Sequence, residues 1–163
     1  MGIPIFIGLR IAGMPEVAAQ VRSYRKAWQD AGQEGTPDVS LRVPVYVAAT
    51  EAEALSEPQE SFMRQFQRLG TQLVESAAKE GALATEERVE HSEQLSGLTW
   101  EQALREKVAV GTPEMVVERL QEMKETLGLS GVVVELNAGE LIPPEGVARS
   151  LRLFCERVIP AFK

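Results

Sequence analysis

Three short stretches of the chain are hydrophobic at nearly every position. They are residues 3–8 (IPIFIG), 43–49 (VPVYVAA) and 131–136 (GVVVEL). A strand with one face in water alternates hydrophobic and polar residues, whereas a strand covered on both faces is hydrophobic throughout. The three stretches therefore predict parallel β-strands that are buried on both faces.

Between these stretches, hydrophobic residues recur at the spacing of an α-helix. Four sets share the offsets 0, 4, 7 and 11: Val17, Val21, Tyr24 and Trp28; Phe62, Phe66, Leu69 and Leu73; Val116, Leu120, Met123 and Leu127; Val147, Leu151, Phe154 and Val158. Each set predicts a helix with one hydrophobic face that packs on the sheet.

The ends of these helices carry local signals as well. Pro15 and Pro113 suit the first turn of a helix, where the missing N–H is not needed, and Thr112 is placed as an N-cap. Thr99 and Gln102 have the spacing of a capping box. Strands that alternate with such helices predict an α/β fold with right-handed crossovers.

The length and spacing of the elements predict one domain, residues 1–163. Residues 51–108 exceed a simple crossover and predict a helical insertion of two or three helices. A closed (β/α)8 barrel takes about 250 residues, so three strands cannot close one. The chain is therefore predicted to form a small open sheet or part of a TIM-type barrel.

The composition narrows the classes of function. The net charge is −7, from 17 basic and 24 acidic residues without a basic run, which argues against a nucleic-acid partner. No hydrophobic stretch approaches the roughly 18 residues of a membrane span. The single cysteine, Cys155, favours a reducing compartment and is expected in the core, whereas His91 is expected at the surface. We expect a cytoplasmic protein without a membrane partner or a metal site.

Four segments together resemble a known family. They are RSYRKAWQDAG, VPVYVAATEAEA, VAVGTPEMVVERLQEMKETLGLSGVVVEL and SLRLFCERVIPAFK. In this order they resemble the C-terminal part of the bacterial-luciferase-like monooxygenases. That resemblance implies a (β/α)8 barrel, reduced flavin mononucleotide (FMN) or a deazaflavin coenzyme as cofactor, and oxygenation of a small organic substrate.

By the same resemblance, the three strands are the last three of the barrel and residues 51–108 are the family's long insertion. The earlier strands, and a glycine- and serine-rich segment that helps to hold the cofactor phosphate, are not in this chain. We therefore expect the chain alone to bind flavin weakly or not at all.

Ligands of parallel α/β folds bind beyond the carboxyl ends of the strands. The candidate cofactor residues at those ends are Gly8, Arg10, Gly13 and Asn137, and Glu135 ends the third strand. Arg10 could hold a phosphate or a carboxylate, or be an exposed loop charge. Asn137 could bond a flavin edge or a substrate, or serve a turn. No residue is assigned a catalytic role.

A second hypothesis is a non-catalytic partial barrel that self-associates. An open edge of hydrophobic parallel strand promotes aggregation unless something covers it. A second copy could cover it in a two-fold dimer, or the missing N-terminal portion of the barrel could do so.

Overall fold

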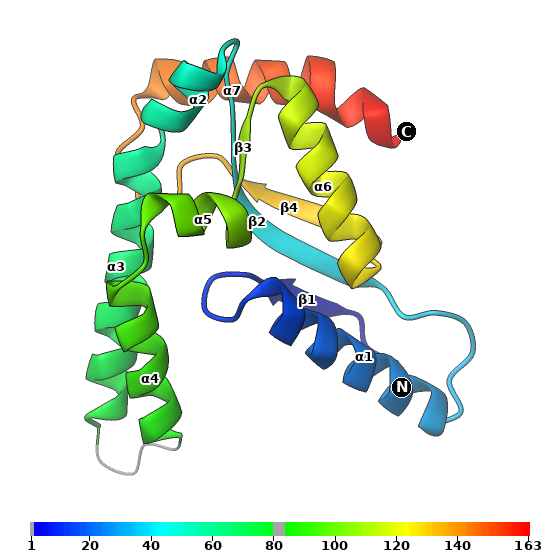
Figure 1. Ribbon diagram of the computed structural model, residues 1–163. Helices are drawn as coiled ribbons and strands as arrows, with labels where there is room; N and C mark the ends of the chain where they lie inside the picture. The colour runs from blue at the N-terminus through cyan, green and yellow to red at the C-terminus, as the bar shows by residue number, and fades with distance from the viewer. Residues whose placement is uncertain (1, 80–83) are drawn as a thin grey trace.

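A computed structural model describes residues 2–79 and 84–163 of the chain (Figure 1). The strands are β1 (Ile5–Gly8), β2 (Val39–Val47), β3 (Ala109–Gly111) and β4 (Gly131–Glu135). The helices are α1 (Met14–Asp30), α2 (Glu51–Ser56), α3 (Gln59–Ala77), α4 (Thr85–Ser96), α5 (Trp100–Glu106), α6 (Pro113–Leu127) and α7 (Pro144–Leu153), followed by a π-helical turn (Phe154–Val158) and a 3-10 turn (Ile159–Phe162).

Strand β2 is the centre of the sheet, and each of the other three strands pairs with it in parallel. Its first half pairs with β1 and β4, so that Leu41 lies level with Ile7 and with Val132. Its last three residues pair with β3. The predicted α/β fold with parallel strands is confirmed, and β3 adds a short fourth strand that the hydrophobic pattern did not predict.

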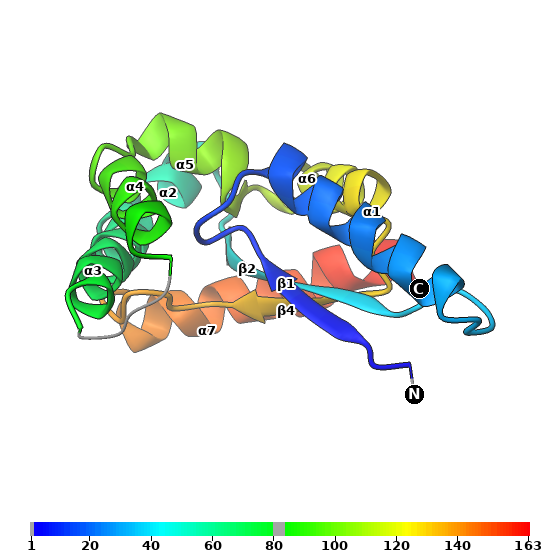
Figure 2. The ribbon, with the colours of Figure 1, turned by 90° about the horizontal axis from the view of Figure 1, so that it is seen from below.

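Helices α1 and α6 cover one face of this sheet (Figure 2). That face carries Val39, Leu41 and Val43, all fully buried. The helices contribute the residues that their spacing predicts, including Val17, Val21 and the whole set from Val116 to Leu127. This layer is the larger of the two hydrophobic cores.

The opposite face is covered over the second half of β2, where Tyr46 packs in the second core, but the described residues leave it uncovered over β1 and β4. Phe6 is 57% exposed and Val133 is 48% exposed, beside the partly buried Ser40 and Arg42 of β2. The expectation that all three strands are buried on both faces is therefore wrong for β1 and β4. The hydrophobic side chains of β1 and β4 on this face are exposed, and none of the described residues packs over them.

The predicted helix ends are confirmed. The Thr112 side chain accepts a hydrogen bond from the Met115 N–H at the start of α6, and Thr99 and Gln102 form the capping box of α5. At the other end of α6, Gly128 has a left-handed conformation that ends the helix (φ +63°). Local capping chemistry thus sets these boundaries.

Residues 51–106 form four helices within the described part of the chain, rather than the predicted two or three. Helices α3 and α4 pack side by side as a hairpin (Figure 1). The additional short helix, α2, begins at a capping box between Thr50 and Glu53. The second core, around Tyr46, Phe62 and Phe66, joins this helical segment to the end of β2.

The C-terminal helix is not the continuous helix that its spacing predicts. The π-helical and 3-10 turns that follow α7 come immediately before and at Pro160, which can neither donate a backbone hydrogen bond nor fit a regular α-helix. Leu151 of the predicted hydrophobic face is 42% exposed, whereas Val158 of the same set is fully buried. Cys155 is exposed too, so its predicted place in the core is wrong.

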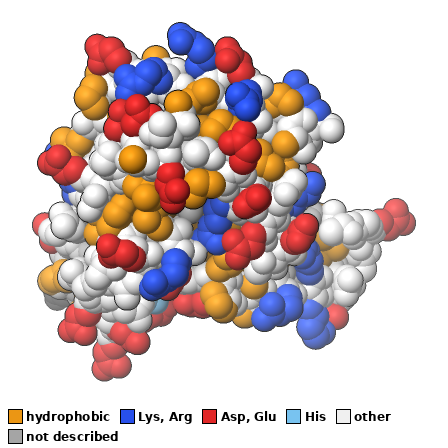
Figure 3. Space-filling model, turned by 45° about the horizontal axis from the view of Figure 1, so that its top comes forward, with side chains coloured by type: hydrophobic (Ala, Val, Ile, Leu, Met, Phe, Trp, Pro, Cys, Tyr) orange, Lys and Arg blue, Asp and Glu red, His pale blue; other side chains and the backbone are white. Residues whose placement is uncertain are grey.

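The surface carries both signs of charge. On the face drawn in Figure 3, acidic and basic side chains are interspersed, with hydrophobic side chains between them. Across the described residues, the helices are too short or too polar to cross a membrane.

Candidate functional site

The carboxyl ends of β1 and β4 meet at a polar cavity of about 270 Å³. Arg10 lies just beyond β1, Arg42 belongs to the middle of β2, and Glu135 is the last residue of β4. Helix α3 closes the other side with Arg68 and three further residues, beside the loop that holds Asn137. The fold thus brings Arg10, Glu135 and Asn137, three of the sequence candidates, to one place.

Two ion pairs lie in this cavity. Arg42 donates from Nη2 to Glu135 Oε1 on the neighbouring strand. Arg68 Nη1 lies 3.2 Å from Glu140 Oε2, and both of these side chains are exposed, so this pair contributes little to stability. Arg10 forms no ion pair or hydrogen bond with the described residues, and its Nε is buried.

Lys107 fixes the loop that carries Arg10. Its ammonium group donates to the carbonyl oxygens of Ile11, at 2.7 Å, and Ala12, at 3.1 Å. Burial lowers the pKa of Lys107, and the nearby carboxylates of Glu106 and Glu16 oppose that shift. Sequence reasoning missed this residue, because a lysine at the end of a helix is usually exposed.

Asn137 serves the loop that follows β4. Its Oδ1 accepts from the Ile142 N–H at 3.0 Å, and its Nδ2 donates to the Ile142 carbonyl at 3.1 Å. Buried Ser61 of α3 donates to the Ala138 carbonyl at 2.7 Å, which clamps the loop against the helix. Of the two interpretations of Asn137, the structure favours the turn.

Gly8 and Gly13 bracket the loop after β1. Gly8 is the last residue of β1, and a Cβ atom placed there would meet only ordinary contacts, the nearest at 3.6 Å. Gly13 is the N-cap residue of α1 and has an extended backbone. Neither glycine lines the polar cavity: Gly8 and Gly13 line two neighbouring cavities.

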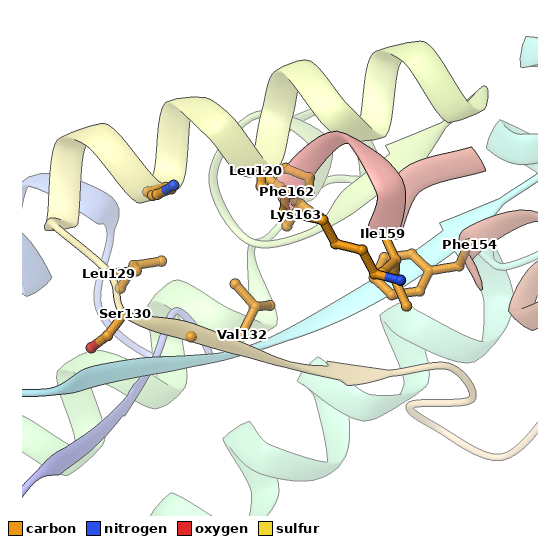
Figure 4. A pocket seen from close by; sticks show the side chains of 10 residues that line it. Leu120, Leu129, Ser130, Val132, Phe154, Ile159, Phe162 and Lys163 are labelled. Carbon is orange, nitrogen blue, oxygen red and sulfur yellow. The ribbon is translucent and has the colours of Figure 1, made fainter. Parts of the chain in front are cut away.

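Two other cavities adjoin the sheet. One, of about 480 Å³, lies on the other side of Arg10 and includes His91, which is partly buried rather than fully exposed. The other, of about 320 Å³, lies at the opposite end of β4 between α6 and the C-terminal turns (Figure 4). Val132, Phe154 and Phe162 are among its mostly hydrophobic lining, and the charged side chains at this cavity are those of Lys124 and Lys163.

Tyr46 belongs to a network at the carboxyl end of β2 that the sequence did not indicate. Its hydroxyl donates to Glu57 Oε2, and Arg149 Nη2 donates to Glu57 Oε1 at 2.9 Å. Burial, reinforced by the Glu57 carboxylate, raises the pKa of the Tyr46 phenol. The network ties β2 to α2 and α7.

Comparison with known proteins shows which family this sequence belongs to. The sequence pattern of the family described as luciferase-like monooxygenase matches residues 1–130. The chain belongs to this family. The resemblance inferred from the four sequence segments is thereby confirmed, and a sequence search of curated proteins finds no significant match.

Several solved structures share the fold. The monooxygenase RslO1 from Streptomyces bottropensis is 22% identical, with a TM-score of 0.64 over 98% of this chain and 42% of that one. The oxygenating constituent of 3,6-diketocamphane monooxygenase from Pseudomonas putida, in complex with FMN, is 20% identical, with a TM-score of 0.64 over 96% of this chain and 41% of that one.

A coenzyme F420-dependent tetrahydromethanopterin reductase from Methanopyrus kandleri is 19% identical, with a TM-score of 0.60 over 99% of this chain and 51% of that one. The chain therefore spans between 41% and 51% of the length of these three proteins. Within the described residues, no group of three or more metal-binding side chains comes together.

Proposed function

We propose that this chain forms part of a luciferase-like, flavin-dependent monooxygenase, in which the carboxyl ends of β1, β2 and β4 contribute one wall of the cofactor and substrate cavity. The observation that carries the proposal is the polar cavity at those ends, which contains the partly buried Arg10, a side chain without an ion pair or hydrogen bond to the described residues. Family membership and the FMN named in one related structure support a flavin cofactor. The F420-dependent relative supports a deazaflavin as the alternative.

The residues present fit this assignment in part. Gly8 leaves the space beside β1 open and Gly13 starts α1 without a side chain, so both backbones can be approached closely. Asn137 lines the cavity too, and although its amide bonds Ile142 through both Oδ1 and Nδ2, its Nδ2 has a second N–H that could reach a ligand. Reduced flavin supplies the oxygen chemistry when it is bound, and the protein holds it in place and limits the access of water.

A fluorescence titration of FMN tests this proposal. The wild-type chain and Gly8→Ala should show the same weak, saturable binding, since a Cβ at Gly8 meets only ordinary contacts. Gly8→Leu should weaken binding at least about tenfold, because its side chain extends into the space beside β1. Binding of FMN or a deazaflavin that is unchanged in Gly8→Leu would contradict the proposal.

The uncovered sheet face supports a second candidate function, a non-catalytic partial barrel that associates with itself. Phe6 and Val133 expose hydrophobic side chains on this face, and β1 and β4 each leave one edge unpaired among the described residues. Light scattering should then show a dimer that Phe6→Glu converts to a monomer, whereas Val74→Glu, on exposed α3 surface, should not. A wild-type monomer at high concentration would contradict this candidate.

A further inference from the structure

The polar cavity at the carboxyl ends of β1 and β4 has two unsatisfied atoms of opposite character. Within the described residues, three buried side-chain nitrogen or oxygen atoms lack a hydrogen-bond partner, and two of them, Arg10 Nε and Glu135 Oε2, belong to residues that line this cavity. The third, Arg25 Nε, belongs to a side chain that donates through Nη2 to the Gly128 carbonyl at the end of α6. Buried polar atoms without partners are rare in native proteins, and a bound water, ion or ligand is a common reason for them.

The charges of the cavity leave one guanidinium without a counter-ion. Arg42 pairs with Glu135, and Arg68 pairs with Glu140. Arg10 has no ion pair among the described residues, although Glu16 and Glu87 line the adjoining cavity on its other side. Although the chain as a whole carries a net charge of −7, this cavity has one positive charge in excess. A small anion bound in this cavity would neutralise the excess positive charge.

Glu135 sets a second requirement for a ligand of this cavity, namely a hydrogen-bond donor. Arg42 occupies only its Oε1 atom, and the side chain of Glu135 is 14% exposed, so Oε2 is buried as an acceptor without a donor. A carboxylate oxygen accepts hydrogen bonds and donates none when it is ionised. A ligand that fits both atoms therefore carries an anionic group for Arg10 and an O–H or N–H donor for Glu135.

We infer that this cavity binds the anionic end of the substrate, a carboxylate with a hydroxyl or amino donor on the neighbouring carbon. A guanidinium matches the planar, two-oxygen geometry of a carboxylate, which makes Arg10 the specificity-determining residue. Glu135 accepts the adjacent donor, and Arg42 is a positioning residue that holds Glu135 in place. The inference rests on the proposed function only in calling this ligand the substrate.

Three small molecules are suitable probes. Glycolate has both the carboxylate and the hydroxyl donor, acetate has the carboxylate alone, and ethylene glycol has hydroxyl donors alone. Titrations of the 15N-labelled chain, followed by NMR, should show glycolate binding about tenfold tighter than acetate, and no saturable binding of ethylene glycol. Arg10→Gln should weaken glycolate binding at least about tenfold, whereas Arg152→Gln, on the exposed surface of α7, should leave it unchanged.

Glu135→Gln separates the second requirement from the first. It should reduce glycolate binding to the level of acetate, while acetate binding stays within about twofold of the wild type. Thermal unfolding checks that each variant is folded, and Arg10→Gln should unfold at the wild-type temperature because Arg10 bonds none of the described residues. Equal affinity for glycolate and acetate in the wild type, or no effect of Arg10→Gln, would overturn the inference.

Competition with FMN distinguishes a substrate site from a phosphate site of the cofactor. Simultaneous binding of glycolate and FMN supports the substrate assignment, and displacement of glycolate by FMN or by inorganic phosphate overturns it. FMN binding that is unaffected by Gly8→Leu would contradict the proposed function but would leave the glycolate result intact, so the two proposals fail separately.

Discussion

Gly139 offers the sharpest test of how the loop after β4 is held on α3. This glycine has a positive φ of +92°, and a Cβ atom there would lie 1.7 Å from the carbonyl oxygen of Ser61. Gly139→Ala therefore strains the backbone and forces the loop away from α3. Ser61 is 1% exposed, and its hydroxyl donates to Ala138 and accepts from the Leu141 N–H.

The magnitude follows from these contacts. The left-handed backbone costs an alanine about 1–2 kcal/mol. Each of the two Ser61 hydrogen bonds contributes about 0.5–1.5 kcal/mol. Gly139→Ala should therefore lower the free energy of unfolding by about 2–5 kcal/mol. Gly35→Ala is the matched control, because Gly35 also has a positive φ, +72°, but no atom lies within 4 Å of the added carbon.

Urea unfolding followed by circular dichroism measures both variants. Gly35→Ala should lose only the backbone cost, so its midpoint should lie about 1 M above that of Gly139→Ala for a chain of this size. If the two glycine variants unfold at the same urea concentration, the close packing of the loop on α3 does not exist, and the cavity described above loses one of its walls.

Three further predictions concern residues that hold the site together. The pKa of Lys107 lies below its ordinary value of 10.5, so between these two values the unfolded chain holds a proton that the native chain has lost. The free energy of unfolding should therefore rise with pH from the lowered pKa up to 10.5. This rise should shrink in Lys107→Met but not in the exposed Lys79→Met. Tyr46→Phe should lower the free energy of unfolding by about 1–2 kcal/mol, and in an absorbance titration of the wild type one of the two tyrosines should ionise only when the protein unfolds in alkali. Thr112→Ala should cost about 1 kcal/mol in urea unfolding, because α6 loses its N-cap, and an unchanged midpoint would refute that role.

The features that were predicted best from the sequence are those that depend on residues close together in the chain. The ends of α5 and α6 follow from local capping chemistry, and both were located correctly at Thr99 and Thr112. The helix faces that pack on β2 were also predicted, because hydrophobic residues that recur about every 3.6 positions form the buried face of a helix. The three-residue strand β3 was missed, because so short an element has no periodicity to detect.

Features that depend on distant residues could not be predicted in the same way. A hydrophobic run indicates that a strand is suited to burial, but it does not say what covers it, and Phe6 of β1 is exposed among the described residues. Sequence position placed Arg10 and Glu135 each at a strand end, and only the fold brings them to one cavity. Arg42 and Lys107 were missed because their roles arise from contacts with residues more than 90 positions away.

Mapping the FMN site by NMR tests the central claim most directly. When the 15N-labelled chain is titrated with FMN, the shifted amide signals should belong to residues at the carboxyl ends of β1 and β4, from Gly8 to Gly13 and around Glu135. Shifts confined to the opposite ends of these strands, or to the hydrophobic cavity beside α6, would contradict the account.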